Sequence, residues 1–358
     1  YNIVQIGTTE ETKIADLPHH IEFDRVYLHG SPTVGQRRGI AANGKNIVVK
    51  NSHFAQFKRQ GEESQAIAIW ASDGPCEITN NYLEAASEGV LIGGAGSAMK
   101  LTPADCLVRD NWINKRLDWK GGGWVVKNFF EIKNGRRIKV ENNLMTNNWL
   151  DAQDGTAILF TTREDNGGRT AIIEDVEFYN NVIRGAGNGI NVYGSEGIGG
   201  RRLIIRNNVF EDLGEKWGGS GVFLKTADWD GLVVENNTVI HSGNITLAWG
   251  RPTKGFVLRG NIVSQNEYGF FGDGAGVGKA AIVKYFPGAV IANNIIIGGS
   301  ADDTGGGNFY PSSIRQVGFA ALERGDLRLA PGSQYATKGL NGRAVGETLD
   351  VNAVGGTR

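Results

Sequence analysis

The feature that most constrains the fold is a segment that recurs about every 30 residues, nine times along the chain. Each segment is anchored on one polar residue, in the series Ser52, Asn81, Asn111, Asn143, Asn181, Asn208, Asn237, Asn261 and Asn294. The positions three and five residues before each anchor, and two after it, hold no polar residue, as Val140, Ile138 and Met145 illustrate. The position two residues before the anchor is mostly charged or polar. This alternation predicts short β-strands with one face buried.

A repeat of this length made of short strands indicates a stacked solenoid. One turn cannot bury its own apolar face, so it buries that face against the turns above and below. Equivalent residues are then expected about 4.8 Å apart, the spacing of neighbouring strands. Helical repeats have an apolar period of 3.6, which these segments lack, and a propeller blade needs roughly 40 residues. We expect the asparagine column to be structural, with amides that hydrogen-bond along the stack.

The repeated segments 140–145, 205–210 and 234–239 resemble those of right-handed parallel β-helix proteins of the pectate-lyase-like superfamily, over roughly residues 43–300. The stretch 325–333 is similar to the end of many bacterial secreted β-helix proteins. The resemblance implies an all-β, single-stranded right-handed parallel β-helix of about nine to eleven turns, in a secreted or cell-surface protein. It implies no single function, because the superfamily holds lyases, hydrolases, epimerases and non-catalytic fibres.

The repeat organises the chain as one structural domain in three parts. We expect an N-terminal segment and cap at 1–42, the parallel β-helix at 43–300 and a C-terminal closing segment at 301–358. A net charge of −1 gives no electrostatic support for nucleic-acid binding. No apolar run reaches membrane-spanning length, so membrane insertion is not expected. The chain opens at Tyr1 rather than Met, which fits a processed or trimmed N-terminus.

The two cysteines occupy equivalent positions of adjacent repeats. Cys76 and Cys106 each lie five residues before an anchor, so they are expected side by side in one inward column. Their spacing allows a disulfide that closes a loop of about 30 residues. The alternative, which we favour from the sequence, is a pair of buried thiols that fill the apolar column.

Each asparagine segment is followed by a second expected strand. The outward residues of these strands form a candidate binding face. Placing the first and third residues of each strand inward gives an outward column of Trp70, Gly93, Lys133, Phe160, Tyr193, Lys225, Trp249 and Asp273. Aromatic rings stack on sugar faces and cations suit carboxylates or sulfates, so the expected ligand is an acidic polysaccharide. Asn191 in one strand, and Asp151 and Asp154 in a long insertion at 147–175, complete the substrate-binding candidates. Alternatively, the insertions cover these aromatic residues as a secondary core.

The catalytic candidates are Lys225, Tyr193, Lys133, Glu131 and Arg163. β-Elimination from a uronic acid needs a base for the proton beside the carboxylate and a cation that neutralises that carboxylate. Tyr193 and Lys225 are expected on adjacent turns, about 5 Å apart at the backbone. The resemblance adds Ca²⁺ as a common helper ion of the superfamily. No metal ligands are assigned, because no acidic loop matches a calcium motif and the histidines lack zinc spacing.

Two other functions compete with a lyase. A glycoside hydrolase needs two carboxylates roughly 5–10 Å apart, and Glu131 with Asp151 or Asp154, one turn on, is the candidate pair. Glu131 and Asp273 lie five turns apart, about 24 Å by strand spacing, and cannot pair. A non-catalytic surface or fibre protein would use the same rod for adhesion or self-assembly. The sequence therefore predicts a secreted polysaccharide-binding protein that cleaves an acidic glycan by β-elimination, ahead of these two alternatives.

Overall fold

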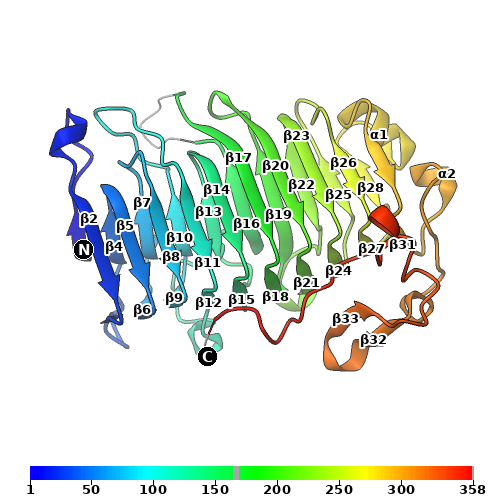
Figure 1. Cartoon of the computed structure of the whole chain (residues 1–358), viewed down its shortest axis with the longest axis horizontal. Helices are drawn as coiled ribbons and strands as arrows, with labels where there is room; N and C mark the ends of the chain where they lie inside the picture. The colour runs from blue at the N-terminus through cyan, green and yellow to red at the C-terminus, as the bar shows by residue number, and fades with distance from the viewer. Residues whose placement is uncertain (164–168, 357–358) are drawn as a thin grey trace.

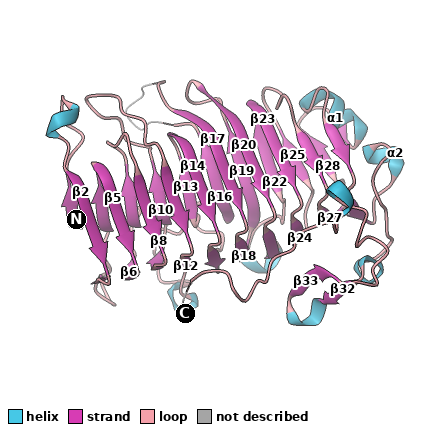
Figure 2. Ribbon diagram, in the orientation of Figure 1, coloured by secondary structure: helices cyan, strands magenta, loops and turns pink. Residues whose placement is uncertain are grey.

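The computed structural model describes residues 1–163 and 169–356, and its backbone forms a solenoid of three long, almost entirely parallel sheets (Figures 1 and 2). Glu164 and Asp165 of the insertion predicted at 147–175 lie outside the described residues. We call the three sheets A, B and C. Along the chain, successive strands belong to sheet A, sheet B and sheet C in turn, so each turn of the solenoid adds one strand to each sheet. Sheets B and C each hold ten strands, and the predicted all-β parallel β-helix is confirmed.

The strands of the three sheets are short, as the alternating segments predict. Sheet A contains β1 (Asn2–Ile6), β4 (Arg38–Ala42), β7 (Gln65–Ile69), β10 (Glu88–Ile92), β13 (Phe130–Ile132), β16 (Thr156–Thr161), β19 (Asn188–Tyr193), β22 (Leu224–Ala227), β25 (Thr246–Ala248), β28 (Phe270–Gly272) and β29 (Gly276–Val277). Sheet B contains β2 (His19–Asp24), β5 (Lys45–Lys50), β8 (Cys76–Thr79), β11 (Cys106–Arg109), β14 (Gly135–Glu141), β17 (Ile172–Tyr179), β20 (Gly199–Arg206), β23 (Trp229–Glu235), β26 (Val257–Arg259) and β30 (Val290–Ala292). Sheet C contains β3 (Tyr27–His29), β6 (His53–Phe57), β9 (Tyr82–Ala85), β12 (Trp112–Asn114), β15 (Leu144–Thr146), β18 (Val182–Ala186), β21 (Val209–Leu213), β24 (Thr238–His241), β27 (Ile262–Ser264) and β31 (Ile295–Ile297).

The asparagine column forms a continuous hydrogen-bonded ladder at the corner between sheets B and C. Asn111 donates from its backbone N and its Nδ2 to Oδ1 of Asn143, at 3.0 and 2.9 Å. Its Nδ2 also donates to the carbonyl oxygen of Ile78, 2.8 Å away. Asn142, just before the anchor, has a φ of 55°, a left-handed conformation that asparagine tolerates. The ladder is structural, as predicted, and it explains the recurring Asn-Asn pair.

The two cysteines form a disulfide, so the favoured interpretation as free thiols is wrong. Cys76 and Cys106 are register neighbours in sheet B, and their Cα atoms lie 4.5 Å apart. That separation falls within the range that a disulfide spans. The bond therefore joins two adjacent turns of the solenoid.

The C-terminal part does more than close the end of the rod. Helix α1 (Lys279–Tyr285) covers that end, with Ala281 and Tyr285 packed into the core. Beyond α2 (Ala301–Thr304) and the hairpin β32 (Phe319–Ala321) and β33 (Asp326–Leu329), the chain runs back along sheet C (Figure 1). Val351 and Val354 pack there on the outer face of the sheet. Among the described residues, no helix is long and apolar enough to span a membrane.

Candidate functional site

The outer face of sheet A carries a groove made of two adjoining cavities. The first, of about 500 Å³, extends from Tyr1 and Arg38 past Trp70. The second, of about 420 Å³, extends from Lys127 to Tyr193. Glu63 and Lys133 line both cavities, so the two form one elongated depression along the solenoid axis. We call this depression the sheet A groove.

Strand register decides which side chains face the groove, and it corrects the predicted outward column at two points. Phe160 pairs with Ile132 and Val192, faces inward and is fully buried. The reason is that β16 is displaced by one residue from the assumed inward pattern, so Leu159 and Thr161 point outward instead. Lys225 does point outward, but it pairs with Asn191, whereas the register partner of Tyr193 is Ala227.

Glu131 lies on the floor of the groove and is 2% exposed. Burial raises the pKa of its carboxyl to about 7, while the nearby positive charge of Lys133 opposes that rise. Asn128 donates from Nδ2 to Oε2 of Glu131 at 3.2 Å. A carboxyl that titrates near neutral pH is suited to proton transfer under ordinary conditions.

A chain of polar side chains extends from Glu131 toward the N-terminus, and all of its members except Glu63 are buried. Lys127 lies 2.8 Å from Glu63 and 3.1 Å from Glu88. Burial works against the charge of Lys127, but Glu88, Glu131 and Glu63 outweigh burial and raise its pKa. Gln65 donates to Glu88 at 2.8 Å and accepts from Arg38 at 2.8 Å. Buried charges are costly unless paired in this way, so the network marks a built site.

Three predicted catalytic residues besides Glu131 line the same cavity. Lys133 is 7% exposed, lies directly after the end of β13 and faces the same cavity as Glu131. Arg163 lies 3.5 Å from Glu196, which also lines the cavity. The ring of Tyr193 stacks on that of Trp249, with ring centroids 5.8 Å apart, across the small side chain of Ala227. The structure therefore brings Glu131, Lys133, Arg163 and Tyr193 into one cavity.

Two predicted substrate-binding residues also line the sheet A groove. Asn191 lines the cavity, and its buried Oδ1 finds no hydrogen-bond donor among the described residues. Trp70 lines the first cavity, under the guanidinium of Arg38 at 4.6 Å.

The remaining candidates lie outside both cavities. Lys225 forms an ion pair with Asp154, whose pKa falls because this pairing outweighs burial. Asp151 accepts a hydrogen bond from the backbone N of Val126, and Asp273 lies near the C-terminal end of the sheet. Neither Asp151 nor Asp154 lines the cavity that Glu131 occupies.

The insertions beside the groove are held together by buried apolar side chains. Trp119, Val126, Trp149 and Trp217 form a small apolar cluster with Ala86. Next to this cluster, Nζ of the fully buried Lys115 lies within hydrogen-bonding distance of four backbone carbonyl oxygens, those of Ala85, Ala86, Ser87 and Asn128. The insertion tryptophans therefore pack among themselves, and they do not bury Trp70, Tyr193 and Trp249, which stay partly exposed. The alternative interpretation, in which the insertions cover these aromatic residues, is wrong for all three.

The described residues do not offer a ready metal site. No group of three or more His, Cys, Asp or Glu side chains among them is arranged to hold a metal ion. The carboxylates of the groove are instead tied to lysines, as in Glu63 with Lys127. These donors do not fit the oxygen cage that Ca²⁺ prefers, so we derive no step through this ion.

Sequence reasoning missed Glu63, Glu88 and Lys127. Glu88 begins β10, two residues before the inward Val90, so strict alternation places it on the inward face. The alternation therefore gave no signal for a groove residue at this position. Glu63 and Lys127 lie in connecting segments, where no period indicates direction, and only the folded chain brings them together.

No protein-family model matches this chain, and a search of curated proteins finds no match either. The class of protein is therefore defined by the fold and the groove alone. This chain is a parallel β-helix solenoid protein with an elongated, charged and aromatic depression on one sheet.

Proposed function

We propose that this chain is a secreted or cell-surface polysaccharide lyase of the pectate-lyase-like superfamily, which cleaves an acidic glycan by β-elimination. The observation that carries the proposal is the convergence of Glu131, Lys133 and Tyr193 on one cavity within an elongated groove. Lys133 and Tyr193 lie on strands two turns apart, about 10 Å at the backbone, which leaves room for a sugar ring. The disulfide supports an oxidising compartment, because such bonds persist mainly outside the cytosol.

The chemistry assigns one role to each group. Lys133 and Arg163 neutralise the uronate carboxylate, which makes the neighbouring C5 proton more acidic. The ionised carboxyl of Glu131 removes that proton, and the electron pair forms the C4–C5 double bond. The C4–O bond breaks, and the departing oxygen takes a proton from the hydroxyl of Tyr193. No water is consumed, and the product carries an unsaturated uronate.

A glycoside hydrolase is the second candidate, because two carboxyls of the cavity have opposite pKa shifts. Burial raises the pKa of Glu131 to about 7. Burial acts in the same direction on Glu63, but the charge of Lys127 outweighs it and holds the pKa of Glu63 below its usual range. One protonated and one ionised carboxyl form the acid and base pair of such enzymes. Glu63 replaces Asp151 and Asp154 as the partner that this function would need.

The test is to incubate the intact protein with a panel of acidic and neutral polysaccharides. Absorbance of the unsaturated uronate and the number of reducing ends are followed in parallel. Both signals rise together if the proposal is correct. Reducing ends without absorbance would indicate hydrolysis, and neither signal would favour the non-catalytic adhesion or fibre role.

A further inference from the structure

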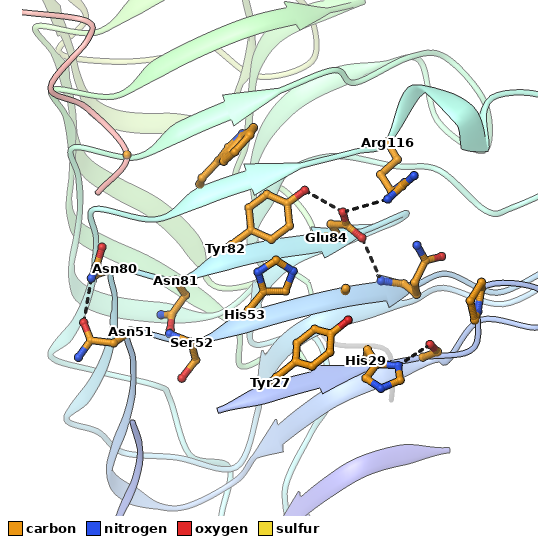
Figure 3. Close-up of a pocket in the computed structure, with 16 residues that line it drawn as sticks. Tyr27, His29, Asn51, Ser52, His53, Asn80, Asn81, Tyr82, Glu84 and Arg116 are labelled. Carbon is orange, nitrogen blue, oxygen red and sulfur yellow. Dashed lines mark hydrogen bonds and ion pairs between the residues drawn. The ribbon is translucent and has the colours of Figure 1, made fainter. Parts of the chain in front are cut away.

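A second pocket lies on the outer face of sheet C, near the N-terminal end of the rod. Its volume is about 820 Å³, larger than either cavity of the sheet A groove. It shares no lining residue with that groove. Figure 3 shows Tyr27, His53 and Tyr82 side by side on successive strands of this pocket. We call it the sheet C pocket.

Four aromatic rings form a ladder along the floor of the sheet C pocket. Tyr27, His53, Tyr82 and Trp112 are register partners on β3, β6, β9 and β12. Successive ring centroids lie 5.2, 4.5 and 4.9 Å apart. Tyr27 is 64% exposed, so the outer end of the ladder faces solvent.

The same row of sheet C changes character where the chain covers it. Beyond Trp112 the row continues with smaller residues, which are Leu144, Val182, Val209, Thr238, Ile262 and Ile295. The C-terminal tail packs on the aliphatic part through Val351 and Val354. The tail contributes Gly355 to the wall of the pocket. The described chain thus covers the aliphatic part as far as Trp112, which packs against the same cluster, and leaves Tyr27 and His53 exposed.

A buried carboxylate gives the pocket a polar side. Glu84 is 4% exposed and accepts hydrogen bonds from the Tyr82 hydroxyl at 2.7 Å and the Gln56 backbone N at 3.1 Å. Arg116 lies 3.9 Å from Glu84, and its guanidinium is also held by Asp118 through two hydrogen bonds of 2.9 and 2.8 Å. These contacts fix the polar groups in place beside the rings (Figure 3).

We propose that the sheet C pocket is a second, non-catalytic binding site for a neutral oligosaccharide. The aromatic ladder supplies faces for the apolar sides of sugar rings, and the polar groups beside it can bind hydroxyls. Of the described residues that line the pocket, Arg116 is the only lysine or arginine, and Asp118 and Glu84 already engage it. An acidic sugar would therefore meet the carboxylate of Glu84 without a spare cation. The proposal does not depend on the cleavage proposed for the sheet A groove.

The test is calorimetric titration of the full chain carrying Glu131→Gln, so that no probe is cleaved. The probes are hexasaccharides of β-1,4-linked glucose, xylose and mannose, with polygalacturonate and alginate hexasaccharides as acidic probes. We expect a neutral probe to bind, and Trp112→Ala or Tyr27→Ala to raise its Kd by about tenfold. The matched control is Tyr268→Ala, an exposed tyrosine outside the pocket, which should change the Kd by less than about twofold.

Any of three outcomes would overturn the proposal of a second site. The first is that no neutral probe binds, and the second is that only acidic probes bind. The third is that neither Trp112→Ala nor Tyr27→Ala changes the Kd of a neutral probe. Since Tyr27 is 64% exposed, its truncation leaves the fold intact and keeps the test valid if the Trp112 variant misfolds. Binding is measured without turnover, so a failure of the proposed lyase activity would leave this result unaffected.

Discussion

Glu131 in strand β13 and Lys133, directly after the end of that strand, point to the same face, with only the inward Ile132 between them. Both side chains are more than nine-tenths buried, at 2% and 7% exposure. Burial raises the pKa of the Glu131 carboxyl to about 7, so this group changes charge at neutral pH. The pH dependence of activity therefore reports the role of Glu131.

We predict that lyase activity falls as the pH drops below about 7. An ionised Glu131 is the base, and its ionised fraction falls by about tenfold per pH unit below its pKa. Glu131→Gln should lower kcat/KM by at least about 100-fold, within the usual range for a lost acid or base. The measurement is the rate of absorbance increase between pH 5 and 9. If Glu131 is instead the acid of a hydrolase, the loss appears above pH 7, and a flat profile contradicts both roles.

Two lysines of sheet A offer a matched comparison. Lys133 lines both cavities, whereas Lys225 lies outside them and is paired with Asp154. Lys133→Ala should lower kcat by about 100-fold, because it removes charge stabilisation in the transition state. Lys225→Ala should change kcat by less than about threefold. Steady-state rates of both variants check this, and an equal loss would place Lys225 in the working site.

The asparagine pair at 180–181 provides a test of the ladder. Asn181→Ala removes the Oδ1 that accepts from the backbone N and Nδ2 of Asn143, at 3.0 and 2.9 Å. Leaving such buried donors unpaired should lower the free energy of unfolding by about 3 kcal/mol. Asn180 has a φ of 57°, so Asn180→Gly should cost less than about 1 kcal/mol. Urea unfolding of both variants measures the difference, and equal losses would contradict the ladder's role.

The fold was predictable because the same pattern of strand and corner residues recurs nine times along the chain. Each repeat has an inward apolar pair and a corner residue in the left-handed conformation, and eight of the nine anchors supply a side-chain amide to the ladder, Ser52 being the exception. Nine consistent copies leave little freedom for another architecture. Residues 1–42 lack the repeat, yet β1, β2 and β3 already form the first turn of the three sheets. Their partners are supplied by the following turn, which local sequence does not reveal.

The site was predictable only where alternation had a reliable phase. Glu131, Lys133 and Tyr193 follow the alternation of their strands and were placed on the correct face. Phe160 was misplaced because β16 holds a run of apolar residues on both faces, which carries no phase information. Glu63 and Lys127 meet at 2.8 Å although 64 residues separate them. Contacts of that kind depend on how the loops fold, and no period encodes them.

The disulfide should contribute to stability by restricting the unfolded chain. Cys76→Ala with Cys106→Ala is expected to lower the free energy of unfolding by about 2–4 kcal/mol, for a loop closed across 30 residues. Urea unfolding with and without reductant measures this effect, and reductant should leave the double variant unchanged. Detection of two free thiols in the denatured, unreduced protein would contradict the disulfide.

The docking of the C-terminal tail should weaken as the pH rises. Glu347 lies on that tail at 1% exposure, and burial raises the pKa of its carboxyl to about 7. Nearby Asp326 raises the pKa further, whereas Arg328 opposes the rise. Between about pH 4.5 and 7, the carboxyl of Glu347 is therefore protonated when the tail is docked and ionised when the tail is undocked. Docking is strongest at low pH and loses about 3 kcal/mol as the pH rises through this window.

Replacement by an uncharged isostere isolates this effect. Glu347→Gln should make docking independent of pH across the window, because the amide does not titrate. Hydrogen exchange of the backbone amides of Gly346 and Gly355 reports docking directly, since these donate to Gly260 and Asn142 at 2.7 and 2.9 Å. In the unaltered protein, their protection relative to the core amides should fall between pH 5 and 8. Equal pH dependence in the variant would show that another group controls the tail.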